Sequence, residues 1–252
     1  MTNFNSKYAE LYNAFNTDKD YLGEFSFLFE IIETKLNRNI QFTQALEIGC
    51  GSGNYTKFLN SKVGNLLAVD ISQEMINEAI KLDLDSTEFA CVTLEELRSK
   101  DLRFDLIISL FHVFSYFTKE DIGNFIQISE QSLSKGGFLV FDFWDLSTVR
   151  KTPPQETKRK IKVNNKIIER RATAATFLEI EIVEVCFSFF ELRADIEAEI
   201  FQEKHRMHAH DLEKILTLFP NYMFHGSFDL VAKSSFNGDH YGNLVILEKI
   251  TG

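Results

Sequence analysis

The pattern of apolar and polar positions divides the chain into parts with different periods. Over residues 4–37, apolar side chains recur three and four positions apart, which predicts two amphipathic helices. From residue 45 onward, short continuous apolar runs replace this period, and such runs are typical of strands that are covered on both faces. Five of them are expected to form a parallel sheet: Ala45–Ile48, Leu66–Val69, Phe89–Val92, Leu106–Ile108 and Phe138–Phe141.

Amphipathic stretches lie between these runs. Ser72–Leu82 begins with a helix-capping residue and has Glu74 in its first turn, and Lys119–Leu133 ends just before Gly136–Gly137. The alternation predicts right-handed crossovers between parallel strands. The expected fold is α/β, a doubly wound and mostly parallel seven-stranded sheet of the Rossmann-like type. A helix over Asp211–Leu218 and two C-terminal strands would complete it.

A β-rich segment follows Trp144. Residues 156–204 lose the helical period, and Asn164–Asn165 is a favoured hairpin turn, so we expect an antiparallel β insertion after strand five. Residues 151–171 carry eight basic and two acidic side chains, whereas residues 178–203 carry eight acidic and one basic. Cross-strand ion pairs are one interpretation of this contrast. The other is that some of the Lys and Arg residues face a phosphate of a ligand.

These elements divide the chain into four expected parts. They are an N-terminal helical lid over residues 1–37, a core over 38–150, the antiparallel insertion or cap over 151–207, and a C-terminal helix with strands over 208–252. The strand candidates inside the insertion are Lys160–Val163, Ile167–Ile168, Leu178–Val185 and Ile196–Phe201.

Composition and charge narrow the class of protein. With 44% hydrophobic and 25% charged residues the chain is of ordinary globular type, and a net charge of −10 disfavours nucleic acid as a partner. Cys50, Cys91 and Cys186 are too few and too far apart for a disulfide framework or a zinc site. The first residues lack a signal-peptide core, and no run reaches the roughly 20 apolar residues of a membrane span. We therefore expect a cytoplasmic protein that does not enter a membrane.

The strongest chemical signal is the segment Ala45–Tyr55, a strand followed by three alternating glycines. Gly49, Gly51 and Gly53 allow positive φ and a close approach of a ligand to the main chain. A dinucleotide fingerprint needs its third glycine one position later, so this loop does not favour a pyrophosphate. Glu47, just before the first glycine, would repel a diphosphate and attract a cationic ligand.

A second acid stands at the end of the next strand. Asp70 can accept hydrogen bonds from both hydroxyls of a ribose. Together, Leu46–Gly53 and Val69–Ser72 resemble the first two motifs of the class I S-adenosylmethionine-dependent methyltransferases. Phe104–Ser109 and Lys135–Phe141 resemble the fourth and fifth strands of that family. The resemblance implies S-adenosylmethionine as the cofactor and makes residues 38–150 its binding core.

The resemblance also implies which residues contact the cofactor. Relatives often carry an acid after the third strand, where this chain has Thr93, so backbone groups near Thr93 and Leu94 would take its place. Met75 either covers the adenine or belongs to the core. The expected cofactor-binding residues are Glu47, Gly49, Cys50, Gly51, Gly53, Asp70, Ile71, Met75, Thr93, Leu94 and Leu110.

Further segments narrow the acceptor. The chain lacks the Asn/Asp-Pro-Pro-Tyr/Phe motif with which some relatives methylate nucleobases, since it reads Ser109–His112 at that place. Tyr8–Phe15, Phe111–Tyr116 and His205–Met207 instead resemble bacterial methyltransferases of nucleotide-linked sugars, among them amino-sugar N-methyltransferases. One active-site Tyr of that type is replaced by Asn16 here.

Methyl transfer is an in-line displacement that depends mainly on positioning. An amine needs only a proton outlet, whereas a sugar hydroxyl benefits from a base such as His112, whose alternative role is structural. Tyr116 matches a His or Tyr position near the acceptor. The expected catalytic residues are therefore His112 and Tyr116. The expected substrate-binding residues are Tyr12, Tyr21, Trp144 and Arg206.

The sequence leaves several alternatives open. Arg206 either holds a phosphate or carboxylate of the acceptor or forms a surface salt bridge. His205, His208 and His210 do not have the spacing of a zinc site, so no metal is expected. The acceptor is a small molecule, either a nucleotide-linked sugar or another metabolite such as a carboxylic acid, amine or quinone precursor. Nitrogen or oxygen methylation, a homodimer, and a non-catalytic S-adenosylmethionine-binding protein remain open, whereas the loop spacing disfavours an NAD enzyme.

Overall fold

The computed structural model describes residues 6–35, 42–193 and 196–251. The ends of the predicted N-terminal helical stretch, residues 4–5 and 36–37, lie outside the described residues. Within it are α1 (Ser6–Phe15), α2 (Tyr21–Glu30) and a short π-helical turn, η1 (Ile31–Lys35), which together contain the two predicted helices.

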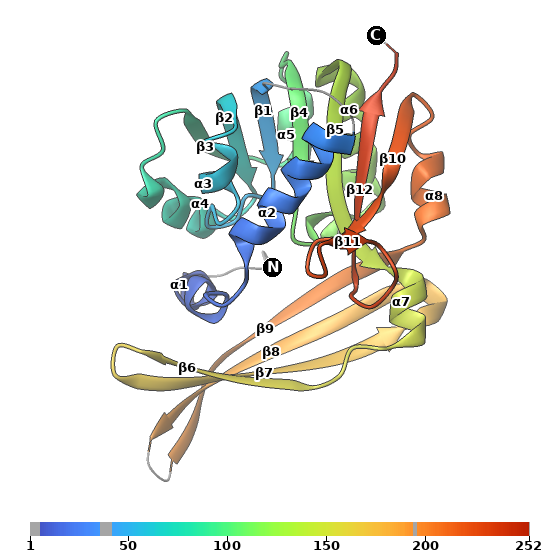
Figure 1. Cartoon of the computed structure of the whole chain (residues 1–252). Helices are drawn as coiled ribbons and strands as arrows, with labels where there is room; N and C mark the ends of the chain where they lie inside the picture. The colour runs from blue at the N-terminus through green and yellow to red at the C-terminus, as the bar shows by residue number, and fades with distance from the viewer. Residues whose placement is uncertain (1–5, 36–41, 194–195, 252) are drawn as a thin grey trace.

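A twisted sheet forms the centre of the molecule (Figure 1). Seven strands lie in the order β3-β2-β1-β4-β5-β12-β10, and β12 runs antiparallel to both of its neighbours. This arrangement confirms the predicted mostly parallel α/β sheet. The strands are β1 (Phe42–Ile48), β2 (Val63–Asp70), β3 (Thr87–Cys91), β4 (Phe104–Ser109), β5 (Leu133–Asp145), β10 (Tyr222–Asp229) and β12 (Gly242–Lys249), and β10 also pairs with the short β11 (Ser234–Ser235).

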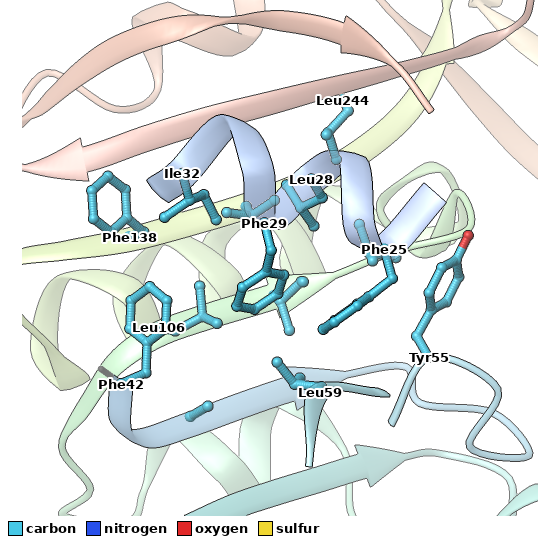
Figure 2. Packing of buried hydrophobic residues seen from close by; sticks show 14 of the residues in the cluster. Phe25, Leu28, Phe29, Ile32, Phe42, Tyr55, Leu59, Leu106, Phe138 and Leu244 are labelled. Atoms are coloured by element: carbon cyan, nitrogen blue, oxygen red, sulfur yellow. The ribbon is translucent and has the colours of Figure 1, made fainter. Parts of the chain in front are cut away.

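Helices cover both faces of this sheet, which explains why its strands are apolar without alternation. On one face, α2, α3 (Thr56–Leu59) and α4 (Gln73–Ala79) pack on a cluster that includes Leu106 and Phe138 (Figure 2). The neighbouring positions Ile107 and Leu139 point to the other face. They pack there beneath α5 (Leu94–Arg98), α6 (Lys119–Ser132) and α8 (Leu212–Thr217).

Side-chain caps fix where the helices start. The hydroxyl of Ser72 accepts a hydrogen bond from the Met75 amide at 3.3 Å, as its predicted capping role requires. Thr93 and Thr118 cap α5 and α6 in reciprocal capping boxes with Glu96 and Asp121. These caps set the direction in which each helix leaves the carboxyl end of its strand. Two short 3₁₀ turns, η2 (Ile80–Leu82) and η3 (Val113–Tyr116), complete the connections.

The β-rich segment forms a second, antiparallel layer on the side where β5 ends (Figure 1). A helix, α7 (Leu146–Lys151), leads into β6 (Thr157–Val163), β7 (Lys166–Phe177), β8 (Ile182–Arg193) and β9 (Ile196–His210). Asn164 and Asn165 connect β6 to β7 with φ of 48° and 63°, as the predicted tight turn requires. The last residues of β5 also pair with β9, so the two layers are joined by main-chain hydrogen bonds.

One predicted strand boundary is wrong. The run Leu178–Val185 was expected to be a single strand, but Leu178–Ile180 forms the 3₁₀ turn η4 and β8 begins only at Ile182. Glu181 has a left-handed φ of 57°, which reverses the chain between β7 and β8. The His205–Met207 segment, expected simply to precede a helix, lies within β9.

Opposite charges do pair across the insertion. Five of the eight basic residues in 151–171 form ion pairs with carboxylates: Lys158, Arg159, Lys160, Lys166 and Arg171. Lys160 stands directly opposite Glu169 between β6 and β7, for example, and Lys166 reaches Glu191 on β8. The cross-strand interpretation is therefore confirmed for Lys160, Lys166 and, through Glu197 on β9, Arg171. Lys158 instead pairs with Glu156 just before its own strand, and Arg159 pairs with Asp18 after α1.

None of the helices within residues 6–35, 42–193 and 196–251 combines the length and apolar character needed to cross a lipid bilayer.

Candidate functional site

A cavity of about 1050 Å³ lies where the carboxyl ends of the central strands, α1 and the insertion meet. Ligand pockets usually measure roughly 300–1,000 Å³, so this volume is at the upper end of the range and suits two molecules bound together. The cavity lies at the edge of the sheet where open α/β folds bind their ligands.

The glycine loop forms one wall. Gly49, Gly51 and Gly53 have φ of 75°, 54° and 81°, which is the left-handed region predicted for this loop. A Cβ on Gly49 would come within 2.5 Å of Val113, whereas a Cβ on Gly51 would meet no atom within 4 Å. Gly51 therefore leaves space that a ligand can use. Gly53 does not line the cavity, and its role is to let the loop turn beside Leu82.

Asp70 shapes the same loop. Its carboxylate accepts hydrogen bonds from the backbone amides of Gly51 and Ser72, both at 2.9 Å. Burial raises the pKa of this carboxyl, and backbone hydrogen bonds from Ser72, Gly51 and Ile71 oppose the shift. A carboxylate has about four lone-pair sites, so Asp70 can fix the loop and still accept hydrogen bonding from a ligand.

Glu47 is buried beneath the loop and accepts a hydrogen bond of 2.6 Å from the hydroxyl of Thr56. Burial raises its pKa to about 8, with a smaller contribution from the charge on Asp70 and an opposing one from the Thr56 hydrogen bond. The carboxyl is therefore largely protonated at neutral pH without a ligand. A cation next to it would favour the ionised form.

The other predicted cofactor residues also line the cavity: Cys50, Ile71, Met75, Thr93, Leu94 and Leu110. Met75 is fully buried, so it belongs to the core and to the wall at once. The side chain of Thr93 is occupied by its capping box with Glu96. Contacts from this position would therefore come from its backbone.

His112 stands at the end of β4 in a strained turn. Both Phe111 and His112 have left-handed φ, of 67° and 65°, which is costly for residues with a Cβ. Asp142, at the end of β5, holds this turn by accepting the His112 amide at 2.7 Å. Its second oxygen lies 3.0 Å from His112 Nδ1. The Asp142 carboxylate thus fixes the backbone of this turn by a hydrogen bond and faces the imidazole ring at ion-pair distance.

Tyr116 lies deeper in the cavity, with its hydroxyl 3.0 Å from His205 Nδ1 on β9. Burial raises the pKa of Tyr116 far above its usual value, so the phenol stays protonated. Burial also lowers the pKa of His205 to about 4, helped by the charge of Arg170, so the imidazole stays neutral. The pair is a neutral hydrogen-bonding unit. Sequence reasoning rejected His205 as a metal ligand and placed it in the resembling segment His205–Met207, but it gave His205 no role in the site.

The remaining predicted substrate residues, Tyr12, Tyr21, Trp144 and Arg206, also line the cavity. Trp144 stacks on Tyr241 with ring centroids 4.8 Å apart and planes inclined by 17°. Arg206 lies at the rim, its side chain 62% exposed and 3.9 Å from Glu184. This placement weakens the case for Arg206 as the main anchor of a buried anion.

Helix α1 lies against the glycine loop. The side-chain oxygen of Asn13 accepts hydrogen bonds from the hydroxyl of Ser52 at 2.6 Å and from Asn54 at 3.0 Å. After α1, the ammonium of Lys19 pairs with Glu24 and lies 4.8 Å from the centre of the Phe111 ring. These contacts position the N-terminal helices over the cavity.

Within the described residues, no group of three or more His, Cys, Asp or Glu side chains is arranged to hold a metal ion.

The central part of the chain, which contains much of this site, matches a known protein family. Residues 45–137 match the model of a family described as a methyltransferase domain. This stretch runs from β1 into β5 and contains the glycine loop, Asp70 and His112. It therefore covers the first three motifs of the sequence resemblance and the start of the fourth, and it confirms that resemblance.

Individual relatives share more of the chain. A dTDP-3-amino-3,4,6-trideoxy-alpha-D-glucopyranose N,N-dimethyltransferase of Streptomyces venezuelae is 24% identical over 144 residues, 54% of this chain and 57% of that protein. An uncharacterized protein of Methanocaldococcus jannaschii is 30% identical over 156 residues, 62% of this chain and 68% of that protein. The match therefore spans little more than half the length of the first of these relatives.

The fold as a whole also has solved counterparts. The crystal structure of an S-adenosylmethionine-dependent methyltransferase from Clostridium acetobutylicum matches with a TM-score of 0.74 at 23% identity, covering 96% of this chain and 98% of that one. The insertion is thus part of the shared fold.

Proposed function

The chain belongs to the S-adenosylmethionine-dependent methyltransferases, and from this premise we propose that it methylates an amino or hydroxyl group of a nucleotide-linked sugar. The observation that carries the proposal is the single large cavity with two chemically different ends. The buried carboxyl of Glu47, the half-buried carboxyl of Asp70 and the glycine loop form one end. A histidine fixed by Asp142 and a set of aromatic side chains form the other.

The first end suits the cofactor. Its sulfonium and ammonium are cations, which Glu47 would attract, and its ribose would offer two hydroxyls to Asp70. Gly51 provides the close approach to the main chain. S-adenosylmethionine would supply the electrophilic methyl group, and this chain's residues would bind and orient it.

The second end suits the acceptor and its proton. With S-adenosylmethionine bound, the acceptor nitrogen or oxygen would bond to its methyl carbon as the methyl–sulfur bond breaks, which would leave a neutral thioether. The acceptor then loses its proton, for which Nε2 of His112 is the available base while Asp142 steadies the ring. Tyr116 is protonated, so it would donate a hydrogen bond to the acceptor rather than remove its proton.

Aromatic walls favour a sugar ring as the acceptor. Trp144 and Tyr241 present a flat stacked surface, of the kind that packs against the C–H faces of sugars, and Tyr12 and Tyr21 add phenols nearby. The relative from Streptomyces venezuelae is by name an amino-sugar N,N-dimethyltransferase, which supports the same class. Asn16 lines the cavity where that type carries a Tyr, so its active-site contact is not carried over.

Calorimetry with three adenosine-containing ligands separates the classes of function. We expect micromolar binding of S-adenosylmethionine and of its demethylated product, and no binding of NAD. Asp70→Ala and Gly51→Val should abolish both signals. A panel of nucleotide-linked amino and neutral sugars with methyl-labelled cofactor then tests the acceptor. Labelling of a fatty acid or simple amine instead would refute the sugar assignment, and binding without any labelling would indicate a non-catalytic binding protein.

A further inference from the structure

Arg170 on β7 differs from the other basic residues of the insertion. Five of its seven basic neighbours in residues 151–171 pair with carboxylates, and the remaining two, Lys151 and Lys162, are exposed to solvent. Arg170 instead lines the cavity. In the part of the chain that the structure describes, its guanidinium forms no ion pair with a carboxylate. Among the described side chains, this cation in the binding cavity thus has no carboxylate partner.

The strand geometry explains why Arg170 faces inward. Alternate residues of β7 point to the same side, so Arg170 shares its face with Ile168 and Ala172, both buried. Arg171 points to the opposite face and pairs with Glu169 and Glu197. Arg170 and Arg171 are neighbours in the sequence, but because they point to opposite faces of β7, only Arg170 reaches the cavity.

Two aromatic rings hold the guanidinium in place. Its central carbon lies 5.0 Å from the centre of the Phe15 ring on α1 and 4.9 Å from that of Phe187 on β8. Such contacts orient a guanidinium and leave its N–H edges available. The nearby titratable groups are the phenols of Tyr8 and Tyr12, the guanidinium of Arg159 and the neutral imidazole of His205. The phenols are neutral at physiological pH, because burial raises their pKa.

Burial lowers the pKa of Arg170, and the charge of Arg159 adds to this shift. The cation therefore lies in a site that disfavours it until an anion arrives. A guanidinium offers two parallel N–H groups, which match the oxygens of a phosphate. Glu47 and Asp70 lie at the cofactor end of the cavity, so an anionic part of the acceptor would bind away from them, beside the insertion.

Resting on the proposed function, we propose that Arg170 binds a phosphate of the acceptor's diphosphate and so selects sugars activated by a nucleotide. It would act as a specificity-determining residue that anchors the acceptor without touching the reacting atoms. This assigns the anion site to Arg170 on β7 rather than to the rim residue Arg206.

The test compares Arg170→Gln and Arg170→Lys with Arg193→Gln, which removes an exposed arginine of the same sheet that pairs with Glu191 outside the cavity. Thymidine diphosphate is titrated by calorimetry into each protein saturated with the demethylated cofactor. We expect Arg170→Gln to weaken its binding about ten- to hundredfold, the range for a charged hydrogen bond. Arg170→Lys should lose part of the affinity, and Arg193→Gln should bind like wild type. Unchanged binding of the demethylated cofactor shows that the variants are folded.

Kinetics provide the second readout. With a nucleotide-linked acceptor, Arg170→Gln should raise KM by a similar factor and leave kcat nearly unchanged, whereas the same sugar without its nucleotide should show no difference from wild type. An equal loss with both acceptors would mean a structural role and would overturn the proposal. The wild type could instead bind glucuronic acid more tightly than thymidine diphosphate and lose this preference in Arg170→Gln. That result would overturn the proposal and indicate a carboxylate-binding site. Failure to bind S-adenosylmethionine would instead refute the proposed function.

Discussion

Single residues at this site act through neighbours that are distant in the sequence. His112 follows β4, and Asp142 lies near the end of β5, thirty positions later. The parallel pairing of the two strands brings them together. Asp142 satisfies a strained amide and faces the imidazole with the same carboxylate. A structural histidine would need only one of these contacts, so the arrangement favours a functional ring.

Asp142→Asn tests this arrangement. The amide side chain keeps its size and can still accept the His112 amide, but it loses the charge that would stabilise a protonated ring. We expect kcat to fall about 100-fold with little change in cofactor affinity, because a positioned base contributes roughly 10²–10⁴ to the rate. Steady-state assays of Asp142→Asn, His112→Gln and the double variant provide the measurement. Losses that multiply in the double variant would show that the two residues act independently.

Glu47 makes stability and cofactor binding depend on pH in opposite ways. Its pKa is about 8 in the folded protein against an ordinary value near 4.5. The folded state therefore binds a proton that the unfolded state has lost between these values. The contribution of Glu47 to the free energy of unfolding of the unliganded protein is therefore fully present below pH 4.5 and is lost as the pH rises through 8. A bound cation reverses this preference by favouring the carboxylate.

Two measurements follow for Glu47→Gln. Chemical denaturation at pH 8.5 should show the unliganded variant to be more stable than wild type by about 2–5 kcal/mol, with the difference shrinking toward pH 5. S-adenosylmethionine should bind wild type more tightly at pH 8 than at pH 6 and release a proton, whereas the variant should bind weakly at both. A wild-type affinity that does not change with pH would show that Glu47 does not meet the cationic part of the cofactor.

The level of a single residue is also where sequence reasoning reached its limit. The glycine loop, Asp70 and His112 could be found because each directly follows an apolar run. Asp142 also follows such a run, but only the pairing of β4 with β5 reveals its partner. Arg170 is one of eight basic residues, and the direction it faces depends on the register of β7. No local pattern contains that information.

At the scale of elements, the sequence was most informative where burial on both faces or a cap determines the structure. The five core strands and the start of α4 at Ser72 agree with their apolar runs and capping residue. The turn at Leu178–Ile180 was missed because its apolar residues alternate as in a strand. Glu181, which lies just before β8, has a left-handed φ, but its residue type does not predict a turn as Gly or Asn would.

Helix α1 is the element that connects the cofactor end to the rest. Asn13 bonds the glycine loop through Ser52 and Asn54. Asn13→Ala removes these bonds while raising helix propensity, so α1 itself should not be weakened. We expect S-adenosylmethionine affinity to fall about three- to tenfold, mainly through faster release, as the loss of one or two net hydrogen bonds implies. Stopped-flow dissociation measures this effect. Glu10→Ala, an exposed change on the same helix, should leave the rate unchanged, and an equal effect there would point to general loosening of the helix.

At the scale of the whole molecule, helix α1 contacts the insertion as well as the glycine loop. Tyr8 packs on Phe187 and Phe189, and Phe15 meets both Phe189 and the guanidinium of Arg170. One wall is therefore shared by the glycine loop, α1 and the acceptor end of the cavity. A cofactor that fixes α1 against the loop would also fix the aromatic surface that the acceptor needs.

Binding of the two ligands should consequently be coupled. Typical coupling free energies of about 1–3 kcal/mol correspond to roughly a 5–150-fold change in affinity, and the effect must be equal in both directions. We expect thymidine diphosphate to bind several times more tightly to protein saturated with the demethylated cofactor than to the free protein, and the cofactor product to gain the same factor from thymidine diphosphate. Asn13→Ala should reduce this factor toward one, because it releases α1 from the loop, while Glu10→Ala should preserve it. Equal affinities with and without the cofactor product would mean that the two ends of the cavity bind their ligands independently and that α1 transmits nothing between them.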